Sequence, residues 1–144
     1  MRAVSKGAEA VLSVLVEGLG EPGTKSARLE LDRSSGGYMP VVVERVAERR
    51  FSVAHYYVQN GDRMRDPEVV FFRGADGRCF PIEMTQDPYG CRVLAELRED
   101  GSLARYRPKA QREVATFCTL WMRNVKAQQG IGTRARSRKA RVTA

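Results

Sequence analysis

The sequence predicts an α+β fold, in which an antiparallel meander sheet of about six or seven strands carries one helix from each end of the chain. Apolar residues recur at helical spacing near both ends, whereas residues 28–106 form short runs rich in Val, Phe and Tyr between turn residues. The connections between these runs are too short for parallel crossovers. We expect a single domain over 1–129, followed by a flexible basic tail over 130–144.

The first helix is predicted over residues 5–18. Ser5 can cap its start, and Gly18 can end it. Its apolar side chains form one stripe along the helix: Ala8, Val11, Leu12, Leu15 and Leu19.

The strands are expected between turns that are marked by Gly, Pro, Asp or Asn. Residues 59–67, which contain the Asn60-Gly61 turn signal, are interpreted as a longer connection. The predicted strands cover residues 28–33, 38–47, 50–58, 68–73, 78–85, 91–97 and 103–106.

The second helix is expected to begin at Pro108, which removes an N–H group that the first helical turn cannot use, and to stop at Gly130. We expect it to pack on the sheet through Phe117 and Trp121. Its apolar stripe consists of Ala110, Val114, Phe117, Cys118, Trp121 and Val125.

Composition argues against several classes of protein. No stretch approaches the ~20 apolar residues that cross a bilayer, and residues 10–16 lack the flank and length of a secretory signal, so we expect a cytoplasmic protein without membrane contact. The three cysteines, Cys79, Cys91 and Cys118, are widely spaced, and the chain has one histidine. We therefore expect three small, partly buried thiols, and we expect no metal, cofactor or disulfide framework.

The positive charge of the chain is concentrated at one end. The net charge is +8, yet residues 104–144 alone hold eleven basic residues and a single acid, Glu113. The remaining residues therefore carry a net charge of −2. This asymmetry predicts a cationic surface that the folded body does not neutralise.

The basic residues of the second helix fall on the arc opposite its apolar stripe and lead into the tail. A ridge of this kind next to a flexible arm is typical of proteins that bind the phosphate backbone, although a solvated helix face with a solubilising tail has the same pattern. Binding would depend steeply on salt and little on base sequence, because no helix-turn-helix, zinc-finger or RNA-recognition signature is present. The candidate residues are Lys109, Arg112, Arg123, Lys126, Arg134, Arg136, Arg138, Lys139 and Arg141.

A second constellation surrounds the only histidine, His55. Together with Asp62, Asp66 and Glu68, it could form an acid–base pair or a carboxylate metal site, as in a small hydrolase or nuclease, and Glu83 and Asp87 follow in the meander. The alternative is that His55 lies half-buried on a strand and the aspartates stabilise turns.

The same stretch resembles an uncharacterised domain family that occurs in phages, conjugative elements and large polyvalent proteins. The resemblance covers residues from about 10 to 128, and Pro88, Tyr89 and Cys91 depart from the family pattern. It implies residence on a mobile genetic element and a possible counter-defence role, but no activity. The resembling residues are His55, Tyr56, Tyr57, the run 59–62, Met64, the run 66–68, Phe71, Pro81, Gln86, Asp87, Gly90, Trp121, Arg123 and Asn124.

Together these features favour a non-enzymatic accessory protein of a mobile element that binds a macromolecule. Nucleic acid, bound by the basic helix and tail, is the leading ligand. A host protein, contacted by the sheet face or by residues 59–67, is the alternative partner. A hydrolase or nuclease built on His55 is the competing class.

Overall fold

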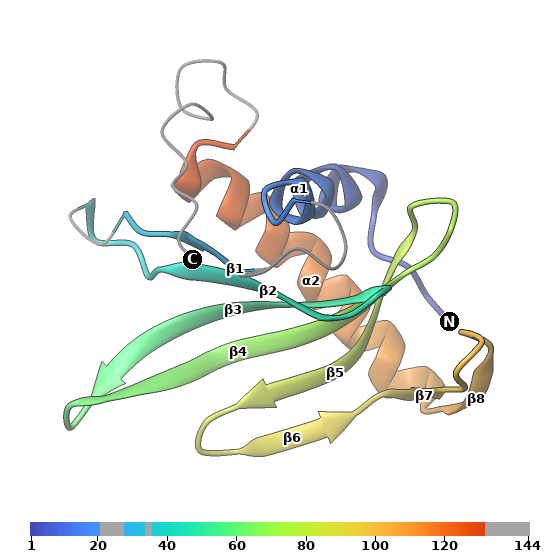
Figure 1. Cartoon of the computed structure of the whole chain (residues 1–144). Coiled ribbons are helices and arrows are strands. Elements are labelled where there is room, and N and C mark those ends of the chain that lie inside the picture. Colours follow the sequence, from blue (N-terminus) through green and yellow to red (C-terminus); the bar gives the residue numbers. More distant parts are fainter. Residues whose placement is uncertain (21–27, 34–35, 132–144) are drawn as a thin grey trace.

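The computed structural model describes residues 1–20, 28–33 and 36–131. Within these ranges the chain forms two helices, a six-stranded sheet and a two-stranded sheet, and both helices lie on the same face of the larger sheet (Figure 1). The α+β class and the meander are confirmed. The predicted basic tail falls outside the described residues from position 132 onward, and neither described helix has the length and apolar content that crossing a membrane requires.

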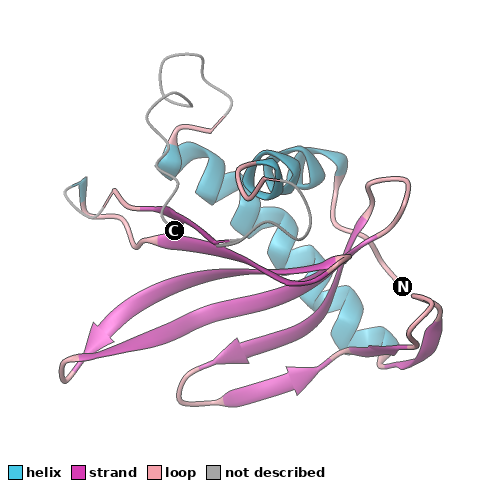
Figure 2. Cartoon of the chain, in the orientation of Figure 1, coloured by secondary structure: helices cyan, strands magenta, loops and turns pink. Residues whose placement is uncertain are grey.

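The larger sheet is a meander in which each strand pairs antiparallel with the next one along the chain, in the order β1-β2-β3-β4-β5-β6 (Figure 2). Its two middle strands, β3 and β4, are the longest. Its strands are β1 (Arg28–Leu31), β2 (Val41–Ala47), β3 (Arg50–Gln59), β4 (Asp62–Arg73), β5 (Cys79–Gln86) and β6 (Gly90–Val93). The smaller sheet pairs β7 (Ala95–Leu97) with β8 (Leu103–Tyr106).

Both helices begin and end where the sequence indicates. The Ser5 hydroxyl accepts a hydrogen bond from the backbone N–H of Ala8 at 3.1 Å, which satisfies one free donor at the start of α1 (Lys6–Glu17), and Gly18 is its C-cap. Helix α2 (Pro108–Gln129) starts with proline and ends at Gly130 in the left-handed conformation, at φ 68°.

The core lies between the helices and the sheet. Leu12 of α1 and Met122 of α2 are fully buried, and Phe51 stacks on Phe71 across β3 and β4 with ring centroids 5.4 Å apart. Trp121 is 5% exposed, as predicted.

The predicted packing of Phe117 on the sheet is wrong. This side chain is 41% exposed and stacks on Trp121, with ring centroids 5.9 Å apart. Phe117 lies one helical turn before Trp121, at the margin of the apolar stripe. It therefore shields the tryptophan from solvent and leaves the contact with the sheet to Trp121.

The predicted connection over residues 59–67 is also wrong, because these residues belong to a hairpin. Gln59 pairs directly with Asp62, so Asn60 and Gly61 alone form the turn, with φ values of 52° and 86°. Both central residues need positive φ in such a turn, and Asn-Gly is the pair that tolerates it best. The charged residues that suggested a loop lie instead on the first half of β4.

The predicted strand over residues 91–97 is divided between the two sheets. Leu94, 1% exposed, separates β6 from β7. Its N–H donates to the carbonyl of Ile82 at 2.8 Å, and its carbonyl accepts from the N–H of Arg107 at 2.9 Å. Burial of this single leucine therefore anchors the β7–β8 hairpin next to the start of α2.

Gly61→Ala is expected to lower the free energy of unfolding by about 1–2 kcal/mol, because a Cβ is strained at the positive φ of this position. Gly7→Ala in α1 is the matched control: an added Cβ there meets nothing closer than 3.9 Å, and alanine favours the helix. Urea unfolding of both variants measures the difference. Equal stabilities for Gly61→Ala and the unsubstituted protein would contradict the turn.

Candidate nucleic-acid interface

His55 is a core residue that joins β3 to α2. It is 5% exposed, and its Nδ1 accepts a hydrogen bond from Nε1 of Trp121 at 3.1 Å. Its Nε2 is buried and has no hydrogen-bond partner within the described ranges. Burial lowers the pKa of His55, and the negative charge of Asp66 only partly opposes this effect. His55 is therefore a neutral packing residue without access to a substrate.

Of the three candidate carboxylates, only Asp66 lies close enough for its charge to act on His55. Asp62 is exposed beside the hairpin turn, and Asp66 accepts a hydrogen bond from Nε2 of Gln86 at 3.2 Å. Glu68 pairs with Ala54, so it points to the sheet face opposite the one that His55 occupies. The described residues contain no group of three or more His, Cys, Asp or Glu side chains that could hold a metal ion. These four residues therefore form no acid–base or metal site.

Asp87 holds two hairpins together. Its carboxylate accepts hydrogen bonds from the backbone N–H of Arg65 at 2.9 Å and from the Nε and Nη2 of that arginine at 3.0 and 3.2 Å. These bonds lower the pKa of Asp87. Tyr57 donates its hydroxyl to the carbonyl of Asp87 at 3.2 Å. Asp87 lies in the β5–β6 turn, so these bonds fasten that turn to the β3–β4 hairpin. The role of Asp87 is therefore structural.

Several arginines of the strands lie beside carboxylates. Arg63 lies over the ring of Tyr56, with its Cζ 4.5 Å from the centroid, and donates to Glu30 at 3.0 Å. Arg28 lies 3.5 Å from Glu44, and Arg105 lies 2.8 Å from Glu96. Four strand arginines, Arg28, Arg63, Arg65 and Arg105, thus have a carboxylate partner, whereas Arg50, Arg73 and Arg92 have none within ion-pair distance among the described residues.

Helix α2 presents a different surface, which we call the basic face. Its four residues are all exposed, and none of them has a carboxylate within ion-pair distance in the described part of the chain. The basic face consists of Lys109, Arg112, Arg123 and Lys126. It extends along about 25 Å of helix at 1.5 Å per residue. The other five candidates, in the tail, lie outside the described residues.

The N-terminal segment brings two further cations to this surface, which the sequence analysis missed. The N–H of Arg2 donates to the side chain of Gln111, which donates back to the carbonyl of Arg2, both at 2.8 Å. The N–H of Ser5 donates to the hydroxyl of Thr119 at 3.1 Å. These bonds hold the backbone of Arg2 and Ser5 against α2, and the side chains of Arg2 and of Lys6, which follows Ser5, are exposed. In the sequence, this contact is indicated only by Gln111, a polar residue that interrupts the apolar side of α2.

The thiols differ in burial. Cys79 and Cys118 are buried, Cys91 is exposed, and all three are free. Burial raises the pKa of Cys79 to about 11 and also raises the pKa of Cys118. Neither buried cysteine is therefore an activated nucleophile at neutral pH.

Residues 11–131 match the model of a family described as "Domain of unknown function (DUF6908)". No curated protein and no solved structure matches the chain.

Proposed function

Since the chain belongs to the DUF6908 family, whose function is unknown, we propose an activity from the surface of the protein itself: it binds the phosphate backbone of nucleic acid through the basic face of α2. The observation that supports this proposal is the contrast between the two layers. Four arginines of the strands form ion pairs with carboxylates, whereas all four cations of the basic face of α2 have none among the described residues.

The geometry of α2 suits a contact with a polyanion. A rigid helix holds the four cations on one side, and duplex DNA carries one charge per ~1.7 Å of its axis, so about 25 Å of helix meets many phosphates. Because Val114, Cys118, Trp121 and Val125 of the apolar stripe are buried, this helix cannot also insert that face into a membrane. Arg2, Lys6 and the basic residues after position 131 would extend the contact.

We further propose, from the resemblance of residues 55–71 to proteins of phages and conjugative elements, that this binding serves a mobile genetic element. The alternative is a counter-defence role in which a host protein is the partner. Removal of the basic residues separates the two proposals, since a host-protein complex that uses the sheet face does not need them.

We expect binding to generic duplex DNA to depend less on salt when four residues are replaced by glutamine: Lys109, Arg112, Arg123 and Lys126. The slope of log affinity against log salt concentration is negative, and its magnitude is expected to decrease by about 3–4. The same four contacts account for an affinity loss of about 100-fold between about 50 and 200 mM salt in the unsubstituted protein. Fluorescence anisotropy of a labelled duplex at several salt concentrations measures both values. Truncation after Ile131, which keeps that buried residue, is expected to weaken binding further.

The matched control removes the same number of charges from the strands and their turns, at Arg28, Arg78, Arg92 and Arg105. It is expected to keep the salt slope of the unsubstituted protein. Equal slopes for the α2 variant and the unsubstituted protein would overturn the basic face as the binding surface. An interaction with a co-purified host protein that survives both changes would favour the alternative partner.

A further inference from the structure

An exposed aromatic ring lies next to the basic face of α2. Phe117 is 41% exposed, and one side of its ring stacks on Trp121 at an interplanar angle of 24°. In the described part of the chain no other aromatic ring stacks on Phe117, and no guanidinium group lies over it. Because the buried Trp121 supports one side of the ring, the ring presents its other side to solvent in a preorganised orientation.

Phe117 begins a row of exposed side chains that ends in two cations of the basic face. Residues three positions apart are neighbours on a helix surface, with their Cβ atoms about 5–6 Å apart. The row, which we call the stacking row, consists of Phe117, Leu120, Arg123 and Lys126, and Leu120 is 53% exposed. An apolar, aromatic end is therefore continuous with a cationic end along one line of α2.

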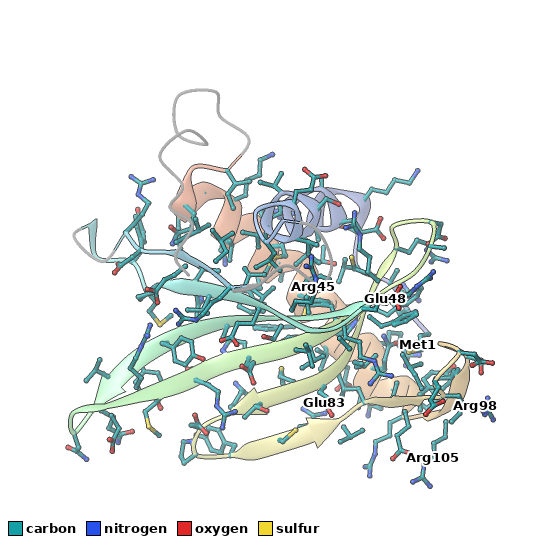
Figure 3. The ribbon with its side chains drawn as sticks, in the orientation of Figure 1. Met1, Arg45, Glu48, Glu83, Arg98 and Arg105 are labelled. Atoms are coloured by element: carbon teal, nitrogen blue, oxygen red, sulfur yellow. The ribbon has the colours of Figure 1, made fainter. Side chains whose placement is uncertain are left out.

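The flank of α2 that carries Phe117 is unfavourable for phosphate. Glu113, which is exposed one turn before Phe117, repels anions. Two arginines of the β7–β8 hairpin, which precedes α2, have partners within that hairpin (Figure 3). Arg105 lies 2.8 Å from a carboxylate oxygen, and Arg98 donates to a backbone carbonyl at 2.8 Å. A bound nucleic-acid strand would therefore keep its phosphates on the basic face, with its bases directed toward Phe117.

Unpaired nucleobases fit the aromatic end of the stacking row. The bases of a single strand expose flat faces that stack on aromatic side chains, whereas the bases of a duplex are stacked on one another. A membrane surface fits less well, because Phe117 and Leu120 are the only exposed large apolar residues of α2 and a helix in a membrane interface buries a whole apolar face.

From these features we infer that the stacking row binds single-stranded nucleic acid. A base stacks on Phe117, and the phosphates of neighbouring nucleotides contact Arg123 and Lys126. This inference rests on the proposed function, and it adds that the ligand is unpaired.

A comparison of two single strands that carry the same phosphates tests the stacking contact. One probe is a labelled oligothymidylate of about 15 nucleotides, and the other is an abasic strand of the same length. In anisotropy titrations at one salt concentration, the unsubstituted protein is expected to bind the strand with bases about 5- to 100-fold more tightly. Phe117→Ala is expected to reduce this ratio to near one, and Phe117→Trp is expected to retain it.

Two further variants control for apolarity and for exposed aromatic rings in general. Phe117→Leu keeps an apolar side chain over Trp121 but has no ring, so it is expected to lose most of the ratio. Tyr89→Ala removes a ring that is 86% exposed in the β5–β6 turn, outside α2, and is expected to keep the ratio of the unsubstituted protein. Circular dichroism and urea unfolding verify that each variant is folded.

An equal ratio in Phe117→Ala and the unsubstituted protein would overturn the stacking row, even if both proteins bind duplex DNA with the salt slope expected for the basic face. Absence of binding to the single strand, the abasic strand and the duplex would overturn the proposed function as well. Binding to vesicles of anionic phospholipid that Phe117→Ala weakens, together with an unchanged ratio for the two strands, would assign the row to a membrane surface instead.

Discussion

Trp121→Ala is expected to lower the free energy of unfolding by about 3–5 kcal/mol, the range for a large aromatic removed from a packed core. Trp121 is 5% exposed, lies edge-on to the ring of His55 with the centroids 5.4 Å apart, and donates its only N–H to that imidazole. Its removal therefore leaves a cavity under α2 and also leaves both nitrogens of His55 without a hydrogen-bond partner among the described residues.

Urea unfolding followed by circular dichroism measures this loss, because Trp121 is the only tryptophan and its fluorescence disappears with the substitution. Leu120→Ala is the matched control on the same helix. Leu120 is 53% exposed, so its loss is expected to cost far less. Trp121→Phe separates the two contributions, since it keeps much of the apolar volume but removes the donor. Similar stabilities for Trp121→Ala and Leu120→Ala would refute the packing of α2 on the sheet.

Acidification is expected to destabilise the protein through His55. In the unfolded chain this histidine takes up a proton near its ordinary pKa of 6.5, whereas burial lowers its pKa in the folded protein. Between these two values the unfolded state binds more protons, so stability decreases as the pH falls, by up to about 1.4 kcal/mol per pH unit. A proton on Nδ1 would also oppose the N–H of Trp121, which needs an acceptor there.

His55→Gln provides the control for this pH dependence. Its side-chain oxygen can accept the hydrogen bond of Trp121, and the variant contains no histidine, because His55 is the only one in the chain. Denaturant unfolding between about pH 7.5 and 5, above the range in which ordinary carboxylates titrate, is expected to lose its slope in this variant. An equal slope in the unsubstituted protein and the variant would show that another group is responsible.

Most of the fold could be predicted because local signals agreed with the tertiary structure. Ser5 and Gly18 mark the two ends of α1, and Pro108 and Gly130 mark the two ends of α2. They could be recognised because the backbone geometry at helix ends restricts which residues fit. The short connections required neighbouring strands to be antiparallel.

The errors arose where burial, rather than local composition, decides the structure. Four of the six residues in 62–67 are charged, and the segment resembles a loop in sequence, but pairing with β3 satisfies the backbone groups of several of them. Leu94 gives no local sign that a strand ends there, because its two backbone hydrogen bonds come from β5 and from the residue before α2.

The candidate site was predictable only in part. Helical spacing was sufficient to place Arg112 and Arg123 on the solvent side of α2, since the apolar stripe fixes the opposite side. Spacing could not show that Arg2 lies next to Gln111, because the two residues are 109 positions apart in the sequence. Sequence proximity also suggested that His55 and Glu68 could cooperate, but strand alternation places them on opposite faces of the sheet.

The contact between α1 and α2 has a consequence for synthesis of the protein. Helix α1 precedes the sheet in the chain and α2 follows it, so the apolar side of strands such as β3 and β4 lacks the cover of α2 until residues 108–129 have been synthesised. A nascent chain that stops before α2 would expose Val53, Val69 and Phe71 to solvent. Premature termination should therefore yield aggregates or substrates for proteases instead of smaller folded fragments.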